Sequence, residues 1–419
     1  MSRRSAVAWR RSSRQQLTGS PADPILSAVR SPLIPLLCLT AAASTLPIGV
    51  FPTLLPDLDR VAHLSDVEIG ALSGAFGFAR MVIDVPVGLF VARHLRWALR
   101  MSPMFLTVGI LAIASGGPFG VLLAGRVVMG LAHSLGMVAW LTTLLRREHD
   151  GRVGASLNAF ELSAMLGMLG GVGLIGSLPS RLGWNVALLI ASVPQLVAVA
   201  VAPWLARTVP PSHSVAAPAT SQLGRGPRSG DRITLLVGLA FATGAVLATA
   251  YSTAELFMLP LRGSRELGLE RASVARMLVI AQTCDILALL PVGFLADRVG
   301  PTRLLGLVVL SMAASSLLIG FGDVSAVAVG AALMGLAMAG WMLPLAVLRN
   351  ETPPAQMAWR TALYRVGVDG GLFAGPFIAG FLGRHVSVLP IALAAMLVTL
   401  ALVCFVAPAS DRHAGRGNP

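Results

Sequence analysis

The sequence contains no lysine, and only 12% of its 419 residues are charged. An ordinary soluble domain carries roughly a quarter charged residues, so this composition excludes that class. Cysteine is scarce as well. Cys38, Cys284 and Cys404 lie far apart in the sequence without the spacing of metal ligands, and we therefore expect no metal site.

The motifs of several catalytic classes are also missing. The sequence has no H-E-x-x-H, no G-x-S-x-G and no Cys/His cluster, which disfavours a polytopic membrane enzyme. Its match to the dinucleotide fingerprint, Gly171 to Gly176, lies inside an apolar run and follows no strand, so we interpret it as a helix-packing surface. Without a nucleotide-binding motif a primary pump is disfavoured too. We expect a protein that is not an enzyme and uses no cofactor.

Hydrophobic residues dominate what is present, at 55% of the chain and a mean hydropathy of +0.77. A helix needs about 20 apolar residues to cross the hydrocarbon core of a bilayer, and many runs of that length are separated by short polar loops. We therefore predict an all-α integral membrane protein with twelve transmembrane helices. The predicted spans are 32–54, 67–91, 99–117, 119–145, 153–177, 182–205, 233–260, 271–296, 303–321, 325–348, 357–382 and 386–407.

The net charge of +13 comes from arginine alone. Most of the 32 arginines fall in the N-terminal tail, the central loop, the C-terminus and alternate short loops, which all lie on one side of the predicted membrane. Because an excess of arginine marks the cytoplasmic side, we expect a multi-pass inner-membrane protein with both termini in the cytoplasm. Its basic surfaces then meet anionic lipid rather than nucleic acid.

A segment rich in proline, serine and glycine divides the chain into two six-helix halves. The halves repeat. Pro86 and Gly88 are related to Pro291 and Gly293 by one offset, and a slightly larger offset relates Glu161 to Asp369. We predict a cytoplasmic basic tail at 1–31, an N-terminal bundle at 32–205, a linker at 206–232, a C-terminal bundle at 233–407 and a cytoplasmic tail at 408–419.

The stretch GFLADRVG between the eighth and ninth spans resembles the G-x-L-A-D-R-x-G loop of the major facilitator superfamily of secondary transporters. The resemblance extends over about 32–407 and implies two pseudo-symmetric six-helix bundles that work by alternating access. It also implies that this loop is a conformational latch. In the first half Ala92 stands where the family has its acid, which weakens that latch. The predicted latch residues are Gly88, Arg93, Gly293, Asp297 and Arg298.

In this family the substrate lies near the membrane midplane between the halves. Arg126 begins an R-x-x-x-G pattern that resembles one found in proton-coupled members, although an interhelical packing bond is the alternative interpretation. The predicted substrate-binding residues are Arg126, His133, Tyr251 and Trp341. They suit a small organic anion or metabolite. Multidrug-type proton antiport is the alternative, a membrane enzyme a remote one, and we expect a monomer.

Several charges lie within predicted spans. Glu161 and Asp285 have no basic residue one turn away on their own helices, and both lie about 12 Å from the cytoplasmic interface. We hypothesise that the pair shares the coupling proton, with Asp369 as the next candidate. A buried charge network is predicted from Arg80, Asp84 and Arg365 together with Asp369, because an arginine precedes each acid by one turn.

Overall fold

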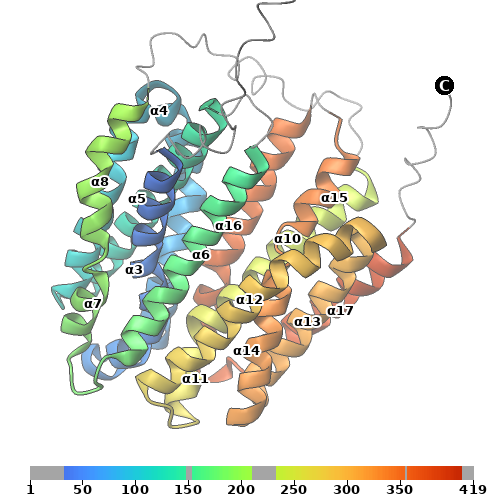
Figure 1. Cartoon of the computed structure of the whole chain (residues 1–419). Helices are drawn as coiled ribbons and strands as arrows, with labels where there is room; N and C mark the ends of the chain where they lie inside the picture. The colour runs from blue at the N-terminus through green and yellow to red at the C-terminus, as the bar shows by residue number, and fades with distance from the viewer. Residues whose placement is uncertain (1–32, 148–152, 210–232, 354–355, 408–419) are drawn as a thin grey trace, which may run out of the picture.

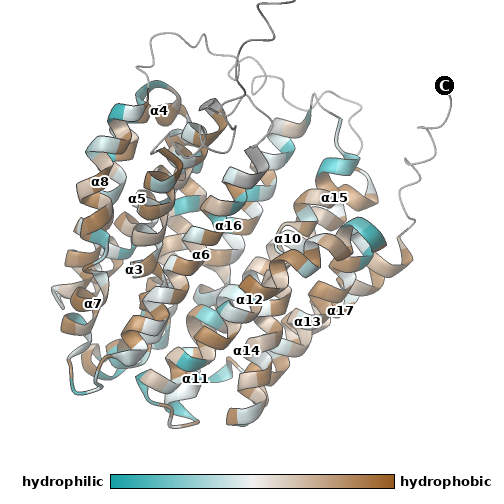
Figure 2. Cartoon of the chain, in the orientation of Figure 1, coloured by the Kyte–Doolittle hydropathy of each residue, from teal (hydrophilic) through white to brown (hydrophobic). Residues whose placement is uncertain are grey.

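Long apolar runs fold as helices in a membrane because hydrocarbon offers no partner for an unpaired backbone group. The computed structural model describes residues 33–147, 153–209, 233–353 and 356–407, and all secondary structure in these ranges is helical. This confirms the predicted all-α class. The predicted tails at 1–31 and 408–419, and most of the linker predicted at 206–232, lie outside the described residues. Figure 2 shows mainly hydrophobic residues along the helices, with hydrophilic residues gathered near their ends.

Eleven helices within the described residues are long and apolar enough to cross a membrane, against twelve predicted spans. The difference comes from α4 (Asp66–Ala114), one element of 49 residues that contains the second predicted span, 67–91, and all but the last three residues of the third, 99–117. Its backbone leaves helical geometry at His94, where φ is −127° and ψ is 40°. The chain therefore turns back within α4, at a break that separates two membrane crossings.

The first half forms the bundle drawn in blue to green on the left of Figure 1. A capping box starts α4, since the Ser65 side chain and the Glu68 carboxylate bond to each other's backbone N–H. The helices of this half are α3 (Leu33–Ala62), α4 (Asp66–Ala114), α5 (Phe119–Arg147), α6 (Val153–Ser177), α7 (Trp184–Ser192) and α8 (Gln195–Thr208).

The second half forms the bundle drawn in yellow to red. Gly300 ends α12 and precedes α13 with φ of 91°, a backbone conformation that glycine adopts readily. The elements of this half are α10 (Leu235–Thr253), the π-helix η2 (Ala254–Met258), α11 (Leu259–Arg265), α12 (Arg271–Val299), α13 (Pro301–Phe321), α14 (Val324–Met338), α15 (Leu343–Glu351), α16 (Met357–Leu382), the short 3-10 helix η4 (Gly383–His385) and α17 (Val388–Val406).

The two most extensive helix contacts between the halves are those of α4 with α16 and of α6 with α12, and α3 also contacts α11 and α12. Small residues allow the backbones of α4 and α16 to approach closely. A methyl group at Gly70 would lie 2.5 Å from the carbonyl oxygen of Pro376, and one at Gly77 would lie 2.8 Å from the backbone nitrogen of Phe373. No larger side chain fits at these positions in this conformation without moving a helix.

The contacts between the halves are concentrated toward one end of the molecule. We call it the closed end; it carries the α3–α4 and α11–α12 connections, at the bottom of Figure 1. The opposite end, with His94 and Gly300, is the open end. There a methyl group at Gly88 or Gly293 would meet nothing within 4 Å, and the side chain of Phe294 is 67% exposed. The halves therefore meet at one end and part toward the other.

Candidate functional site

Arg126 lies in the interior of the first half, on α5, and is only 2% exposed. Its guanidinium carbon lies 3.7 Å from the ring centroid of Phe51 on α3 and 5.2 Å from that of Phe76 on α4. Its Nε donates a long hydrogen bond of 3.4 Å to the carbonyl of Leu72, while its Nη1 has no partner among the described residues. Two aromatic faces thus hold a buried cation that has spare hydrogen-bond donors.

His133 lies near this cation, two turns along α5. Its ring centroid is 5.4 Å from that of Phe76, and its Nδ1 has no hydrogen-bond partner among the described residues. Arg80 approaches the same phenyl ring, with its guanidinium carbon 5.9 Å from the centroid. The structure therefore gathers three nitrogen-bearing side chains around Phe76, which makes this region of the first half basic.

The corresponding region of the second half is acidic and aromatic. Tyr251 and Trp341 meet edge to face with ring centroids 6.2 Å apart. Glu255, within the π-helix η2, is 3% exposed and lies beside the Tyr251 hydroxyl and the Gln282 amide. A π-helix widens one turn and is often found at functional positions. The four predicted substrate-binding residues thus divide into a basic pair, Arg126 and His133, and an aromatic pair beside an acid.

The two predicted coupling residues lie on the helices that pack across the halves, Glu161 on α6 and Asp285 on α12. The Asp285 carboxylate interacts electrostatically with those of Glu161 and Glu255. Within the described part of the chain no arginine or histidine forms an ion pair with any of the three. The structure therefore places Glu161 and Asp285 in one acidic cluster, with Glu255 as a third member.

The predicted charge network lies on the other pair of joining helices. Arg80 of α4 pairs with Asp369 of α16 at 2.9 Å, and Arg365 of α16 pairs with Asp84 of α4 at 2.6 Å. The Asp84 carboxylate also accepts a hydrogen bond from the Ser134 hydroxyl. Because α4 and α16 run antiparallel here, each arginine faces the acid of the other helix. We name Arg80, Asp84, Arg365 and Asp369 the crossed quartet.

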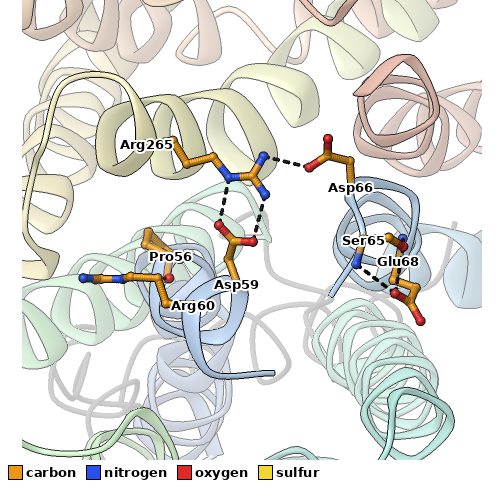
Figure 3. A network of polar contacts seen from close by, with 7 residues as sticks. All are labelled: Pro56, Asp59, Arg60, Ser65, Asp66, Glu68 and Arg265. Carbon is orange, nitrogen blue, oxygen red and sulfur yellow. Dashed lines mark hydrogen bonds and ion pairs between the residues drawn. The ribbon is translucent and has the colours of Figure 1, made fainter. Parts of the chain in front are cut away.

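Ion pairs also join the halves at the closed end, as Figure 3 shows for Arg265. The Arg265 guanidinium donates to both oxygens of Asp59 at 2.8 Å and to Asp66 at 2.7 Å. Nearby, Arg271 bonds to Asp57 at 2.6 Å and to the carbonyl of Leu182 at 2.9 Å. Two arginines of the second half thereby hold three carboxylates of the first.

The predicted latch residues lie at the open end, away from these contacts. Arg93, Asp297 and Arg298 are exposed, and no hydrogen bond or ion pair joins Asp297 to another residue that the structure describes. Gly88 and Gly293 have open space around them. Among the described residues, no ion pair therefore joins these five latch residues to the opposite half.

Two features of the site were not predicted from the sequence. Glu255 was recognisable as an acid of the seventh predicted span that could line the site, but neither the π-helix that sets its place nor its interaction with Asp285 was predicted. The closed-end arginines had a usable signal, because the offset relating Gly88 to Gly293 also relates Asp66 to Arg271. Opposite charges at equivalent loops of a repeat indicate a contact between the halves. Phe51 and Phe76 gave no signal among so many apolar residues.

Comparisons with known proteins bear on the fold and the family. A single-residue mutant of the nucleoside transporter NupG superposes with a TM-score of 0.73 at 14% identity, covering 89% of this chain and 99% of that chain. A bacterial homologue of the human lysosomal transporter Spinster, inward-facing and occupied, gives 0.69 at 14% identity, with 90% and 96% covered. A POT family transporter in complex with 5-aminolevulinic acid gives 0.72 at 12% identity, with 89% and 95% covered. At these identities the likeness shows the fold alone.

No curated protein matches the chain. The family model of the Major Facilitator Superfamily matches residues 37–283 and 233–419, so that together the two matches span both halves. The chain therefore belongs to the major facilitator superfamily, and it is a membrane transporter rather than an enzyme.

Proposed function

We propose that this transporter is a secondary active carrier of a small organic solute, that it works by alternating access, and that protons drive it. The observation that carries the proposal is that the halves are joined unequally. Five ion pairs between arginine and aspartate link the halves at the closed end and in the middle, and among the described residues none links them at the open end. Rocking of the halves exchanges which end is joined.

The acidic cluster supplies the proton site in this proposal. Glu161 and Asp285 lie on α6 and α12, which pack together from opposite halves, and Glu255 adds a third carboxylate that acts electrostatically on Asp285. Three neighbouring carboxylates without a paired cation repel one another, so that binding of a proton relieves the repulsion. Because the cluster spans both halves, that proton also changes how strongly α6 and α12 attract each other. Proton binding is thereby coupled to rocking.

The substrate is, in this proposal, an organic anion whose carboxylate bonds to Arg126. The unpartnered Nη1 of a buried guanidinium needs an acceptor, and a carboxylate matches the guanidinium fork. The alternative substrate is an amphipathic cationic drug, favoured by Tyr251 and Trp341 beside Glu255, because aromatic rings and a carboxylate together bind organic cations. The two alternatives predict opposite charge preferences.

A thermal-shift screen of the purified protein with matched organic anions and cations separates these alternatives, since a ligand of the folded state raises the melting temperature. Stabilisation by anions that disappears in Arg126→Gln supports the organic-anion site. Stabilisation by cations that disappears in Glu255→Gln supports drug binding. If no stabilising ligand of either class causes proton movement when it is added to proteoliposomes, proton-driven transport is contradicted.

Proton coupling is tested with the ligands that this screen provides. Proteoliposomes with an internal pH indicator should report proton movement when such a ligand is added to the wild-type protein. We expect Glu161→Gln and Asp285→Asn to lose accumulation driven by a pH gradient, while exchange without a gradient survives. If both variants keep wild-type accumulation, the pair does not carry the proton and Asp369 becomes the candidate.

The proposal also orients the molecule. The closed end faces outward and the open end faces the cytoplasm, because the arginine-rich loops belong to the open end. The inward-facing state of the Spinster homologue, whose fold this chain shares, supports this orientation. An alkaline phosphatase fused after residue 220 should be inactive, because it stays in the cytoplasm. Phosphatase activity at that junction would reverse the orientation.

A further inference from the structure

The buried pair of the crossed quartet, Arg80–Asp369, lies halfway along the membrane-crossing segments of α4 and α16. Arg80 stands midway between Asp66, where α4 begins, and His94, where it breaks, and is about 21 Å from each at a rise of about 1.5 Å per residue. Asp369 stands at the middle of α16, which extends from Met357 to Leu382. The two residues that form the buried pair are thus central on both helices.

The quartet also marks where the contact between these helices ends. On its closed-end side, backbone touches backbone at Gly70 and Gly77, as described above. On its open-end side Gly88 has nothing within 4 Å. The last contacts before α4 and α16 part are therefore the ion pairs Arg80–Asp369 and Arg365–Asp84.

When two rigid bodies rock against each other, the displacement of an atom grows with its distance from the axis. Contacts at either end must break in one of the two states, whereas a contact at the axis persists in both. A charged pair in the membrane interior is costly to separate, because each ion loses its only compensating charge in a medium of low dielectric constant. Arg80–Asp369 is such a pair, since the Asp369 side chain is only 2% exposed, whereas Arg365–Asp84 is more open, with 43% of the Arg365 side chain exposed. A carrier that broke Arg80–Asp369 in each cycle would face a large barrier.

We propose that the crossed quartet is the pivot of the transporter: Arg80–Asp369 and Arg365–Asp84 stay paired while the two ends of α4 and α16 alternately join and part. The inference rests on the proposed alternating access and adds the axis about which it occurs. Each helix contributes one cation and one anion, so the quartet is neutral and resists sliding of the helices along each other. The closed-end pairs of Arg265 have the opposite role and break in each cycle.

A covalent link tests the pivot. In a background with Cys38, Cys284 and Cys404 replaced by serine, Arg80→Cys and Asp369→Cys are introduced together and joined with a short bifunctional thiol reagent. Removing both charges together avoids leaving one buried ion unpaired. The matched control joins Asp59→Cys to Arg265→Cys at the closed end. Ketone-bearing amino acids carry spin labels that do not react with thiols, placed at exposed Val61 and Val324 for the closed end and at Trp97 and Val299 for the open end.

Distances between the spin labels in lipid nanodiscs then report which end is joined. We expect the unlinked protein to show two distances at each end, one for each state of the transporter. The link between positions 80 and 369 should leave the proportion of the two states unchanged. The link between positions 59 and 265 should leave only the state in which the closed end is joined. Loss of one state on linking 80 to 369 would overturn the pivot while leaving alternating access intact. A single distance at each end of the unlinked protein would contradict alternating access itself and the pivot with it.

A second pair of variants tests the charges themselves. Arg80→Asp alone and Asp369→Arg alone place like charges together, and we expect little folded protein from either. The double variant, Arg80→Asp with Asp369→Arg, restores opposite charges. It should recover folded protein that shows two spin-label distances at each end. Recovery of folded protein with only one distance would show that the pair stabilises one conformation, and would overturn the pivot.

Discussion

The two helix pairs that pack across the halves, α4 with α16 and α6 with α12, occupy equivalent places in the repeat but carry different charges. The offset between Gly88 and Gly293 relates Arg80 to Asp285, and the larger offset relates Asp369 to Glu161. On α4 and α16 the equivalent residues form an ion pair, whereas on α12 and α6 both are acids. One contact is neutralised by the protein itself. The other has no ion-paired arginine or histidine among the described residues, and in the proposed function a proton neutralises it.

This difference separates two tasks that a carrier must perform. A contact neutralised by permanent charges is indifferent to small changes of pH and suits a mechanical role. A contact of carboxylates changes its attraction when a proton arrives and suits energy coupling. The repeat thus provides one architecture twice, and in the proposed function a single change of charge sign at one position gives each copy a different task.

The largest expected effect comes from breaking the neutralised contact. Asp369→Ala leaves Arg80 as an unpaired charge, and removing one partner of a buried pair typically costs about 3–5 kcal/mol. We expect a large fall in the melting temperature of the protein in detergent. Arg80→Ala combined with Asp369→Ala should lose less than Asp369→Ala alone. As the matched surface control, Glu266→Ala breaks an exposed pair with Arg262 and should cost only about 0.2–1 kcal/mol.

The next prediction makes the acidic contact resemble the neutralised one. Asp285→Arg places a cation beside Glu161 and Glu255, so we expect a folded protein that has lost proton movement on ligand addition, because the carboxylates now have a permanent partner. Proton flux in proteoliposomes measures this. Asp285→Asn is the control that removes the acid without adding a cation. Undiminished proton movement in Asp285→Arg would show that the cluster is not the coupling site.

A smaller effect is expected at the closed end, where the pairs are partly exposed. Arg265→Asp replaces two attractions by repulsion from Asp59 and Asp66, at a cost of about 2 kcal/mol, since partly exposed pairs contribute about 1 kcal/mol each. That corresponds to about a thirtyfold shift toward the state in which the closed end is parted. Spin labels at Val61 and Val324 measure it. Glu266→Gln, one residue away, should leave the distances unchanged, and an unchanged distribution in Arg265→Asp would remove Arg265 from the gate.

Much of the fold could be predicted from the sequence because membrane helices must satisfy their own backbone. Apolar runs, the repeat and the G-x-L-A-D-R-x-G loop together predicted the all-α architecture of two bundles. The pairing of Arg80 with Asp369 was less accessible. Spacing along one helix indicates that charges are neutralised, but the partner depends on the antiparallel packing of α4 against α16. The π-helix at Glu255 follows from tertiary packing and leaves no pattern in the sequence.

The smallest expected effect concerns the two latch segments, which differ in the same way as the two contacts do. The loop of the second half has the acid of the family pattern, Asp297, whereas Ala92 occupies the equivalent position in the first half. Asp297 is exposed and joined to no other described residue, so Asp297→Asn should leave the melting temperature unchanged. It should nevertheless impair transport of a ligand found by thermal shift, because the charge acts only when the open end joins. Ala92→Asp restores the acid of the family and should be tolerated, with folding and transport both near wild type.

Spin labels at Trp97 and Val299 give the decisive measurement, since a latch charge stabilises the state in which the open end is joined. We expect Asp297→Asn to lower the population of that state and Ala92→Asp to raise it slightly. Wild-type turnover and wild-type distances in Asp297→Asn would show that this loop is a charged membrane-flanking segment without a mechanical role.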